Sequence, residues 1–254
     1  MITTATGGRG PVRKSREKPG PRYKEIGDEL RTQIADGSYR LSEKLPSEHE
    51  LMQRFETSRA TIRKALAGLA QMGLVYSRRG EGYFVSRPRL TQDLQRLQGL
   101  SECAEASGHQ VFSEVLTTQE VPANPIVAAG LNLDADTPVF ELKRLRYVNR
   151  APFSFDVSYF PLLLGHELVK FDLSRIDVYS LLGDLLDDDL GHADCMIEFT
   201  DAAQDVALAL DAQVGSSLIR MTRVAFMMSG KPVDFEYVYW RPDSYRFKVR
   251  VPRW

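Results

Sequence analysis

Residues 45–66, LPSEHELMQRFETSRATIRKAL, decide the fold of the first part of this chain. Ser47 stands three residues before Glu50, which is the spacing of a capping box at the start of a helix. A tight connection then leads to Ser58, which can cap a second helix whose apolar residues are spaced by three and four. This pattern predicts a helix-turn-helix, in which the first residues of the second helix reach the base edges of DNA.

The flanking segments extend this motif on both sides. Upstream, apolar residues over 23–34 form one helical stripe that ends at Gly37. Downstream, two β-prone runs within 74–86 flank a short glycine-containing segment, which predicts a hairpin. The expected order is therefore helix, helix, turn, helix and a two-stranded wing.

Basic residues stand where such a fold would meet DNA. Arg59 and Arg63 are four residues apart, so both lie on one exposed face of the second helix, and arginine can donate two hydrogen bonds to guanine. Thr61 can bind a phosphate or touch a thymine methyl group. Arg79, beside Gly80 in the hairpin, suits the minor groove or the DNA backbone. These residues could instead only solvate the surface, but their combination with the capping box and the wing favours DNA binding.

The chain divides into a basic first third and an acidic remainder. Residues 1–89 carry 18 Lys and Arg against 10 Asp and Glu, whereas residues 90–254 carry 15 against 24. Such a split is typical of a nucleic-acid-binding module fused to another domain, although chance clustering on solvated faces gives the same count. A length of 254 residues with 43 % hydrophobic residues suits two soluble domains or one large one.

Targeting segments are not evident in the sequence. No stretch has the length and apolar character of a membrane span, and the first residues lack the apolar core of a signal peptide. We therefore expect a cytoplasmic protein without a membrane partner. Cys103 and Cys195 could pair in principle, but two cysteines in a chain of this length are typical of a reduced, cytosolic protein.

The expected domain organisation follows from changes in composition. Residues 1–20, rich in Gly, Pro and basic residues, are expected to form a flexible basic tail. The winged helix-turn-helix occupies 21–86, and a proline-interrupted linker occupies 87–93. Residues 94–254 form a second domain, with a helix over 93–107.

The second domain is expected to be α+β, with a mainly antiparallel sheet and flanking helices. Turn-forming residues at Asn149-Arg150 and at 229–231 join strand-like segments as hairpins do. The expected strands are 111–118, 139–148, 153–160, 193–199, 218–228, 233–240 and 247–251, and the expected helices are 178–186 and 201–210.

Two arginines stand out on the strand over 139–148. Arg144 and Arg146 alternate with apolar residues onto one face of this strand. Burying a lone charge is costly, so both arginines need partners. These partners could be carboxylates within the fold, for which Asp156 on the neighbouring hairpin strand is available, or an anionic ligand.

The first domain closely resembles the GntR family of bacterial regulators. The matching segments are PRYKEI at 21–26, LPSE at 45–48, SRATIRKAL at 58–66, GL at 73–74 and RGEGYFV at 79–85. The resemblance implies a homodimer on a pseudo-palindromic, double-stranded operator. It also implies that Arg59, Thr61, Arg63 and Gly80 touch this DNA. His49 stands where the family usually carries a DNA-contacting Arg, so that contact is expected to be weakened or altered.

The second domain resembles the ligand-sensing UTRA domain of the HutC subfamily, which shares its fold with chorismate lyase. The matching pieces, within 94–251, are RLR at 144–146, AP at 151–152, DVY at 177–179, IE at 197–198 and GKPVD at 230–234. The resemblance implies that Arg144 and Arg146 hold a phosphate or carboxylate of an effector. Asp156, Tyr179 and Asp234 would meet the polar groups of the effector.

Other expected pocket residues include departures from related sensors. Ser101 stands at an expected helix start, where backbone amides can help to hold an anion. Amino-sugar-phosphate sensors of this subfamily tend to carry Glu at Asp156 and Asp234, a hydroxyl residue at Asp177 and Tyr at Trp240. These differences predict an effector with an anionic group plus hydroxyls or a cationic nitrogen, such as a sugar phosphate or a zwitterionic catabolite.

Three functions are open at the level of sequence. The first is an effector-responsive regulator, a repressor of a catabolic operon. The second is an enzyme of chorismate-lyase-like fold that carries a DNA-binding module, and the third is a purely structural DNA-binding protein. No catalytic residue can be singled out, so we expect no enzymatic activity. The four histidines are scattered without metal-ligand spacing, so neither a metal nor a cofactor is expected.

Overall fold

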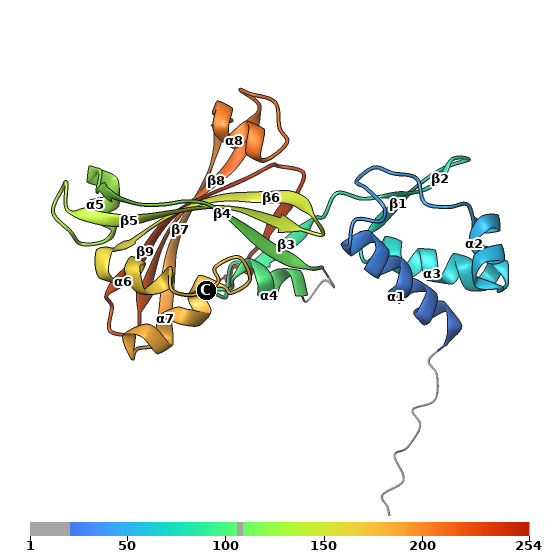
Figure 1. Ribbon diagram of the computed structural model, residues 1–254, viewed down its shortest axis with the longest axis horizontal. Helices are drawn as coiled ribbons and strands as arrows, with labels where there is room; N and C mark the ends of the chain where they lie inside the picture. Colours follow the sequence, from blue (N-terminus) through green and yellow to red (C-terminus); the bar gives the residue numbers. More distant parts are fainter. Residues whose placement is uncertain (1–20, 106–108, 254) are drawn as a thin grey trace, which may run out of the picture.

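The computed structural model describes residues 21–105 and 109–253, which form two domains (Figure 1). The first domain carries three helices and a two-stranded hairpin, and the second carries a six-stranded sheet with helices on both faces. The flexible tail expected over 1–20 lies outside the described residues. Within the described part of the chain, no helix is both long enough and apolar enough to cross a membrane.

The first domain is the winged helix-turn-helix that the sequence predicts. Its helices are α1 (Arg22–Ala35), α2 (Glu48–Phe55) and α3 (Arg59–Gln71), and its hairpin joins β1 (Val75–Arg78) to β2 (Gly82–Val85). The two strands pair in antiparallel register.

Two serine caps set the turn between α2 and α3. The Ser47 hydroxyl accepts a hydrogen bond from the amide of Glu50, whose carboxylate accepts one from the Ser47 amide, so the predicted capping box is present. At the end of α2, Glu56 takes a φ of 47°, which turns the chain out of the helix. Ser58 then accepts a hydrogen bond from the amide of Thr61 to start α3. The tight turn therefore fixes where α3 begins.

One hydrophobic core holds the three helices and the hairpin together. Leu30 of α1, Leu51 of α2, Leu66 of α3 and Val85 of β2 all belong to it, and each is at most 1 % exposed. Full burial of such a side chain stabilises a fold by about 1.5–3 kcal/mol. Because α3 turns its apolar residues into this core, its polar residues face solvent.

The second domain is built on an antiparallel sheet in the order β4-β5-β6-β9-β8-β7. The strands are β4 (Val111–Pro122), β5 (Pro138–Val148), β6 (Ala151–Pro161), β7 (Leu190–Asp201), β8 (Ser217–Met227) and β9 (Pro232–Trp240). Asn149 and Arg150, both at positive φ, join β5 to β6, and a second turn at 229–231 joins β8 to β9. Both predicted hairpins and the α+β class are confirmed.

Helices cover both faces of this sheet (Figure 1). On one face lie α4 (Leu100–Glu105), α6 (Leu162–Leu168) and α7 (Val178–Leu186). On the other face lie α5 (Pro125–Gly130) and α8 (Gln204–Ala209). Side chains on the two faces of the sheet are therefore both shielded from solvent along the central strands.

Two predictions at the start of the second domain are wrong. The helix expected over 93–107 begins only at Leu100. The linker expected over 87–93 ends in a strand, β3 (Leu90–Asp93), which pairs in parallel with β10 (Tyr245–Lys248). The partner strand lies near the other end of the chain, so the local sequence pattern carries no signal for this pairing.

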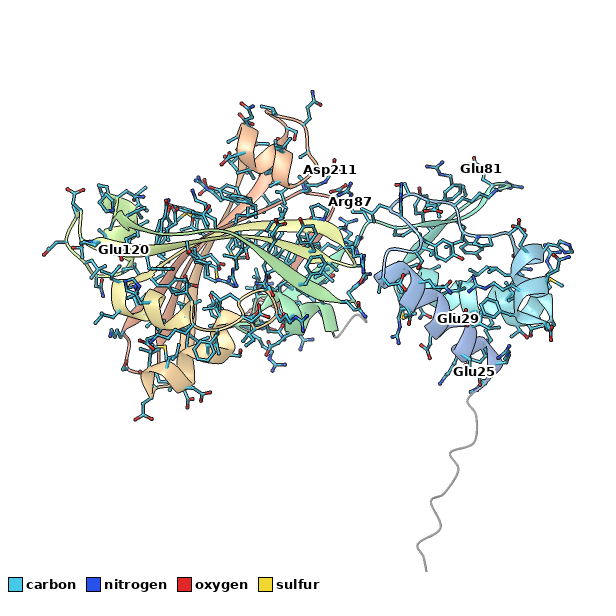
Figure 2. All side chains as sticks on the ribbon, in the orientation of Figure 1. Glu25, Glu29, Glu81, Arg87, Glu120 and Asp211 are labelled. Atoms are coloured by element: carbon cyan, nitrogen blue, oxygen red, sulfur yellow. The ribbon has the colours of Figure 1, made fainter. Side chains whose placement is uncertain are left out.

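Contacts between the two domains include one at Arg87 and one at the end of α1. Arg87, which follows the wing, forms an ion pair with Asp211, with 3.2 Å between Nη2 and Oδ2 (Figure 2). At the end of α1, Gly37 lies against the Arg150 side chain, so closely that an added Cβ would lie 2.9 Å from Arg150 Cδ. Because Arg150 belongs to the β5–β6 turn, this hairpin of the second domain reaches the first domain.

Candidate functional site

The exposed face of α3 carries the predicted DNA-contacting side chains. The side chains of Arg59 and Arg63 are 71 % and 68 % exposed, whereas Ile62 between them is buried in the core. Thr61 stands in the first turn of α3, with its hydroxyl oxygen 2.9 Å from Ser58 Oγ. The start of α3 therefore presents two guanidinium groups to solvent, as a helix that enters the major groove must.

Glu48, which the sequence analysis did not single out, binds both arginines. Its Oε2 accepts a hydrogen bond from Arg59 Nε at 2.6 Å, and its Oε1 lies 3.7 Å from Arg63 Nε. A carboxylate in this place competes with the DNA phosphates and base acceptors that the same guanidinium groups would bind. Its position as the first residue of α2, directly beside the turn to α3, is the signal that could have found it.

The other predicted DNA contacts lie at the wing and on α2. Arg79 and Gly80 are exposed in the β1–β2 turn, where Gly80 takes a φ of 80° that glycine adopts without strain. Glu81 in the same turn (Figure 2) forms an ion pair with Arg78, with 3.6 Å between Glu81 Oε2 and Arg78 Nη1. His49 is exposed on α2. All these positions are accessible to a DNA duplex.

The second candidate site is a cluster of buried charges on the sheet face that α4, α6 and α7 cover. This charge cluster consists of Arg144 and Arg146 on β5, Asp156 on β6, Arg223 on β8, Asp234 and Glu236 on β9, and Asp177 and Tyr179 at the start of α7. Strand register brings them together, because Arg144 lies opposite Asp156, and Arg223 lies opposite Glu236. Alternate residues of four neighbouring strands therefore meet on one face.

The charge cluster lies between two hydrophobic clusters that shield it from solvent. On β9, Val233 belongs to one of these clusters and Val238 to the other, and the two acids of β9 stand between them. Arg144 is 3 % exposed, and Asp156 and Asp234 are 2 % exposed each. Removing an ion from water to this depth costs several kcal/mol, so each charge needs a partner.

Two of the three arginines have carboxylate partners inside the charge cluster. Arg146 donates a hydrogen bond to Asp177 Oδ2 at 3.1 Å and lies 3.7 Å from Asp156. Arg223 binds Glu236 through Nε, at 3.1 Å, and through Nη2. Arg146 therefore has the carboxylate partners within the fold that its sequence pattern allows.

Arg144 and Asp234 take part in none of the ion pairs within 4 Å that the described residues form. Several polar atoms here are fully buried and have no hydrogen-bond partner among the described residues. They are Arg144 Nε and Nη1, Arg146 Nε, Asp156 Oδ1, Tyr179 Oη, Asp234 Oδ1 and Trp240 Nε1. Folded proteins leave few such atoms, so their convergence suits a small polar ligand that supplies the missing partners.

The carboxyl groups of the charge cluster differ in their pKa. Burial and the neighbouring Glu236 carboxylate raise the pKa of Asp234 well above its ordinary value. Although burial opposes it, Arg223 lowers the pKa of Glu236, and Arg146 lowers the pKa of Asp177 in the same way. Glu236 and Asp177 thus favour the ionised form, whereas Asp234 favours the protonated form. Burial and the Glu236 carboxylate also raise the pKa of Asp156, despite its neighbour Arg146.

A cavity of about 20 Å³ borders the charge cluster, with room for little more than one water molecule. Its walls include Arg146, Asp156, Arg223, Trp240 and Tyr245. The Trp240 and Tyr245 rings stack with their centroids 4.8 Å apart. A ligand larger than water therefore needs these walls to move.

The segment before α4 closes the charge cluster on one side. An added Cβ on Gly99 would lie 2.5 Å from Asp177 Oδ2, so only glycine allows this close approach. Leu100 is among the residues that line the cavity. Ser101 is half-buried in α4 and is not among them.

The structure brings most of the predicted effector residues together. Arg144, Arg146, Asp156, Asp177, Tyr179 and Asp234 belong to the charge cluster, and Trp240 lines the adjoining cavity. Arg223 and Glu236 were not predicted from the sequence. Both stand among apolar residues on their strands, which is the same signal that pointed to the two arginines of β5.

A winged helix-turn-helix with exposed arginines, joined to a domain with a buried polar site, defines a DNA-binding regulator with a sensing domain. The family model "Bacterial regulatory proteins, gntR family" matches residues 22–85, and the model "UTRA domain" matches residues 106–246. The chain belongs to the GntR family of bacterial regulatory proteins and carries a UTRA domain. It is a DNA-binding transcription regulator rather than an enzyme, as the sequence predicts.

Relatives cover nearly the whole chain. The uncharacterised HTH-type transcriptional regulator YurK of Bacillus subtilis is 28 % identical over 232 residues, which span 91 % of this chain and 96 % of YurK. The HTH-type transcriptional repressor NagR of the same organism is 28 % identical over 92 % of this chain and 96 % of its own length. Among solved structures, PhnF from Mycobacterium smegmatis has a TM-score of 0.66 at 21 % identity and covers 90 % of this chain and 100 % of its own.

We predict that Glu48→Gln strengthens non-specific DNA binding. The change releases Arg59 and Arg63 from a carboxylate and removes a negative charge beside the DNA, so the affinity for random duplex should rise several-fold. The slope of log affinity against log salt should steepen by about one, which corresponds to one more neutralised phosphate. Fluorescence anisotropy with labelled random duplex at several salt concentrations measures both.

Glu29→Gln is the matched control for this experiment. It removes the same charge from Glu29 of α1, which Figure 2 labels. It also releases an arginine, Arg54, that lies on α2 rather than on α3. Equal effects of the two substitutions would show that Glu48 acts only through net charge.

We predict that two carboxyl groups of the charge cluster affect stability with opposite signs. The pKa of Asp177 is lowered, so its ionised form stabilises the fold at neutral pH, and this stability is lost as pH falls through the folded-state pKa. Asp177→Asn keeps an acceptor for the cap of α7 but loses the charge pair with Arg146. The free energy of unfolding at neutral pH should fall by about 2 kcal/mol, with a smaller deficit below about pH 4.

The pKa of Asp234 is raised, so its stabilising contribution is fully present at acid pH and is lost as pH rises through the folded-state pKa. Asp234→Asn cannot ionise, and its stability relative to wild type should therefore increase as the pH rises from acid to neutral. Urea unfolding over this pH range measures both variants. Asp136→Asn is the control, because it lies in an exposed loop at a φ of 63° that Asn tolerates. Parallel pH profiles for Asp234→Asn and wild type would contradict the prediction.

Proposed function

We propose that this regulator is a repressor of a catabolic operon, and that a small charged effector bound at the charge cluster controls its affinity for operator DNA. The observation that carries the proposal is the set of buried polar atoms without partners in a domain joined to a DNA-binding head. Two relatives support it by name, the repressor NagR and a probable fructoselysine utilization operon transcriptional repressor of Escherichia coli, which is 26 % identical over 221 residues.

On the DNA side, the start of α3 would enter the major groove and the wing would contact the neighbouring groove or backbone. The proposed contacts are His49, Arg59, Thr61, Arg63, Arg79 and Gly80. All of them except the half-buried Thr61 are exposed, which supports this assignment. Glu48 would give up its hydrogen bond to Arg59 and its ion pair with Arg63 when these arginines bind DNA.

On the effector side, the charge cluster would bind the ligand through the residues whose polar atoms lack partners and through Asp177, the partner of Arg146. The proposed contacts are Arg144, Arg146, Asp156, Asp177, Tyr179, Asp234 and Trp240. Ser101 stays a sequence-based prediction, and its short helix adds no support.

The contact between the domains supports a coupling of the two sites. Arg144 and Arg146 lie on β5, and the turn at the end of β5 places Arg150 against Gly37 of the DNA-binding head. A ligand that shifts β5 would act on this contact and on the orientation of the head. Such a ligand changes operator affinity only through a difference in its affinity for the two orientations.

We further propose that the protein acts as a homodimer that pairs through the edge strand β7. Met196 and Phe199 on this strand are 64 % and 75 % exposed, and an exposed edge with large apolar residues favours pairing with another chain. In an antiparallel pairing that places Cys195 opposite its copy, His192 of one chain lies opposite Glu198 of the other. This charge complementarity favours a second copy of the chain as the occupant.

We predict that Arg59→Ala weakens operator binding by about 1–3 kcal/mol and relaxes the base preference at one position of each half-site. The operator is first obtained by selection from a random duplex library with the wild-type protein, and gel-shift titration then measures both variants. Arg31→Ala, an exposed arginine on α1, is the control. Unchanged affinity and base preference in Arg59→Ala would remove this residue from the DNA contacts.

We predict that Phe199→Asp converts the dimer into a monomer at micromolar concentration, because a charge replaces a large apolar side chain at the pairing edge. Sedimentation-velocity measurements report the change, and Leu208→Asp is the control, since Leu208 is 85 % exposed on α8, away from this edge. A dimer that survives Phe199→Asp would exclude the β7 edge as the interface.

A further inference from the structure

We propose that Lys64 of α3 and the basic residues of segment 1–20 form a phosphate band, which binds the DNA backbone beside α3 without reading the base sequence. The partner is the same duplex that the start of α3 meets, at phosphates that flank the bases. The proposal goes beyond the function proposed above. It rests on the DNA-binding class of the protein and needs neither effector control nor base contacts by Arg59.

Lys64 is the member of the phosphate band that the structure describes. Its side chain is exposed, and Glu48 pairs with Arg59 and Arg63 but not with Lys64. The Lys64 ammonium group lies 4.0 Å from the centre of the Tyr23 ring, a cation–π contact that holds it in place. Because Lys64 directly follows Arg63 along α3, this ammonium group borders the face that carries the two arginines. It is thus placed to meet a phosphate at the rim of the major groove.

The start of α1, where residue 20 joins the described chain, lies against the turn that leads into α3. Arg22, the first residue of α1, donates a hydrogen bond from Nη2 to the carbonyl oxygen of Phe55 at the end of α2, over 3.2 Å. Tyr23, the next residue, contacts α3 through Lys64. Segment 1–20 is therefore attached beside the surface through which α3 meets DNA.

Positive charge is concentrated in segment 1–20. It has five basic residues against one acid, a net charge of +4, whereas residues 21–89 reach the same net charge only with 13 basic residues against 9 acids. The five basic residues are Arg9, Arg13, Lys14, Arg16 and Lys18. Few large apolar side chains accompany them, so this composition favours a charged partner over an apolar surface.

Chain length allows all five basic residues to reach the duplex that α3 binds. A polypeptide spans at most about 3.3–3.6 Å per residue, so Lys18 lies within roughly 10 Å of Pro21, and Arg9 within roughly 40 Å. The major groove is about 12 Å wide. The basic residues near Pro21 therefore reach phosphates at the groove that holds α3, and those farther away reach the flanking DNA.

The acidic second domain is the competing partner for a basic segment. Residues 90–254 carry 24 acids against 15 basic residues, and several of these acids, such as Glu236 and Asp177, already pair with arginines of the same domain. DNA carries one negative charge per about 1.7 Å of helix axis, so about 20 charges lie within a reach of roughly 40 Å. DNA bound at α3 is thus the partner with the higher charge density.

Neutral variants of the full-length protein test the phosphate band. One variant, the fivefold variant, replaces the five basic residues of segment 1–20 by Gln, and the other is Lys64→Gln. Arg31→Gln on α1 is the control for Lys64→Gln. The control for the fivefold variant replaces five exposed basic residues of the second domain by Gln, namely Lys170, Arg175, Lys231, Lys248 and Arg250. Fluorescence anisotropy with labelled random duplex and with the selected operator, at several salt concentrations, measures affinity and salt dependence.

Each phosphate contact that is lost lowers the slope of log affinity against log salt by about 0.9. The fivefold variant should therefore lower this slope by about 2–4 and weaken binding about tenfold or more at about 0.1 M salt, and Lys64→Gln should lower the slope by about one. Backbone contacts carry no sequence information, so random duplex and operator should lose affinity by the same factor. Both controls should keep the wild-type slope.

Three results would overturn the proposal. A fivefold variant whose slope changes no more than that of its control would exclude segment 1–20, and an unchanged slope in Lys64→Gln would exclude Lys64. Tighter DNA binding by the fivefold variant would show that the segment binds the acidic domain instead. A loss confined to the operator would show that the segment reads bases rather than phosphates.

Measurements on random duplex separate this proposal from the proposed function. They require neither an operator nor an effector, so they test the phosphate band even if effector control fails. If the phosphate band is absent, the ratio of operator affinity to random-duplex affinity in wild type still tests the base contacts of α3.

Discussion

The need of buried guanidinium groups for counter-charges governs the second domain. Arg144, Arg146 and Arg223 point to one face of the sheet, where two hydrophobic clusters exclude water. The carboxylate partners of Arg146 and Arg223 come from two further strands and from the N-cap of α7. A strand shifted by one residue would turn every one of these groups to the opposite face, so the same ion pairs that neutralise the charges also fix the register of the sheet.

The DNA-binding head meets a similar problem at its surface. Arg59 and Arg63 must be available for DNA, yet two exposed guanidinium groups close together repel each other. The carboxylate of Glu48 lies between them and offsets this repulsion while the protein is free of DNA. In the head the counter-charge is exchangeable because it is near solvent, whereas in the second domain it is held by burial. Both sites thus pair arginine with a carboxylate, but the pairs of the head can exchange with solvent or DNA, whereas those of the second domain are buried.

The sequence predicts those parts of the fold that local chemistry decides. The capping box at Ser47, the hairpin turn at Asn149-Arg150 and the helix over 178–186 each depend on residues within a few positions, and all three are present. The alternation of Arg144 and Arg146 with apolar neighbours likewise depends only on strand geometry, and it led to most of the charge cluster.

The elements and site residues that were not predicted from the sequence depend on distant or unusually short segments. Strand β3 exists because β10 pairs with it from the far end of the chain. The helices α5 and α6 have six and seven residues, too few for a helical repeat to stand out in an apolar run. Glu236 stands among apolar residues as the arginines of β5 do, but the local sequence does not reveal that Arg223 of a neighbouring strand lies opposite it.

The small volume of the cavity beside Trp240 limits how fast a ligand can enter it. An effector that binds the charge cluster, as proposed, would not fit into about 20 Å³, so it could enter only while the Trp240–Tyr245 stack or the segment around Gly99 has moved aside. The apparent affinity is then the intrinsic affinity scaled by the fraction of molecules in the open state. Association can be no faster than the opening itself, so a pulse of metabolite shorter than the interval between openings passes without a response. A closed pocket of this kind would make the protein respond only to changes in ligand concentration that last longer than the interval between openings.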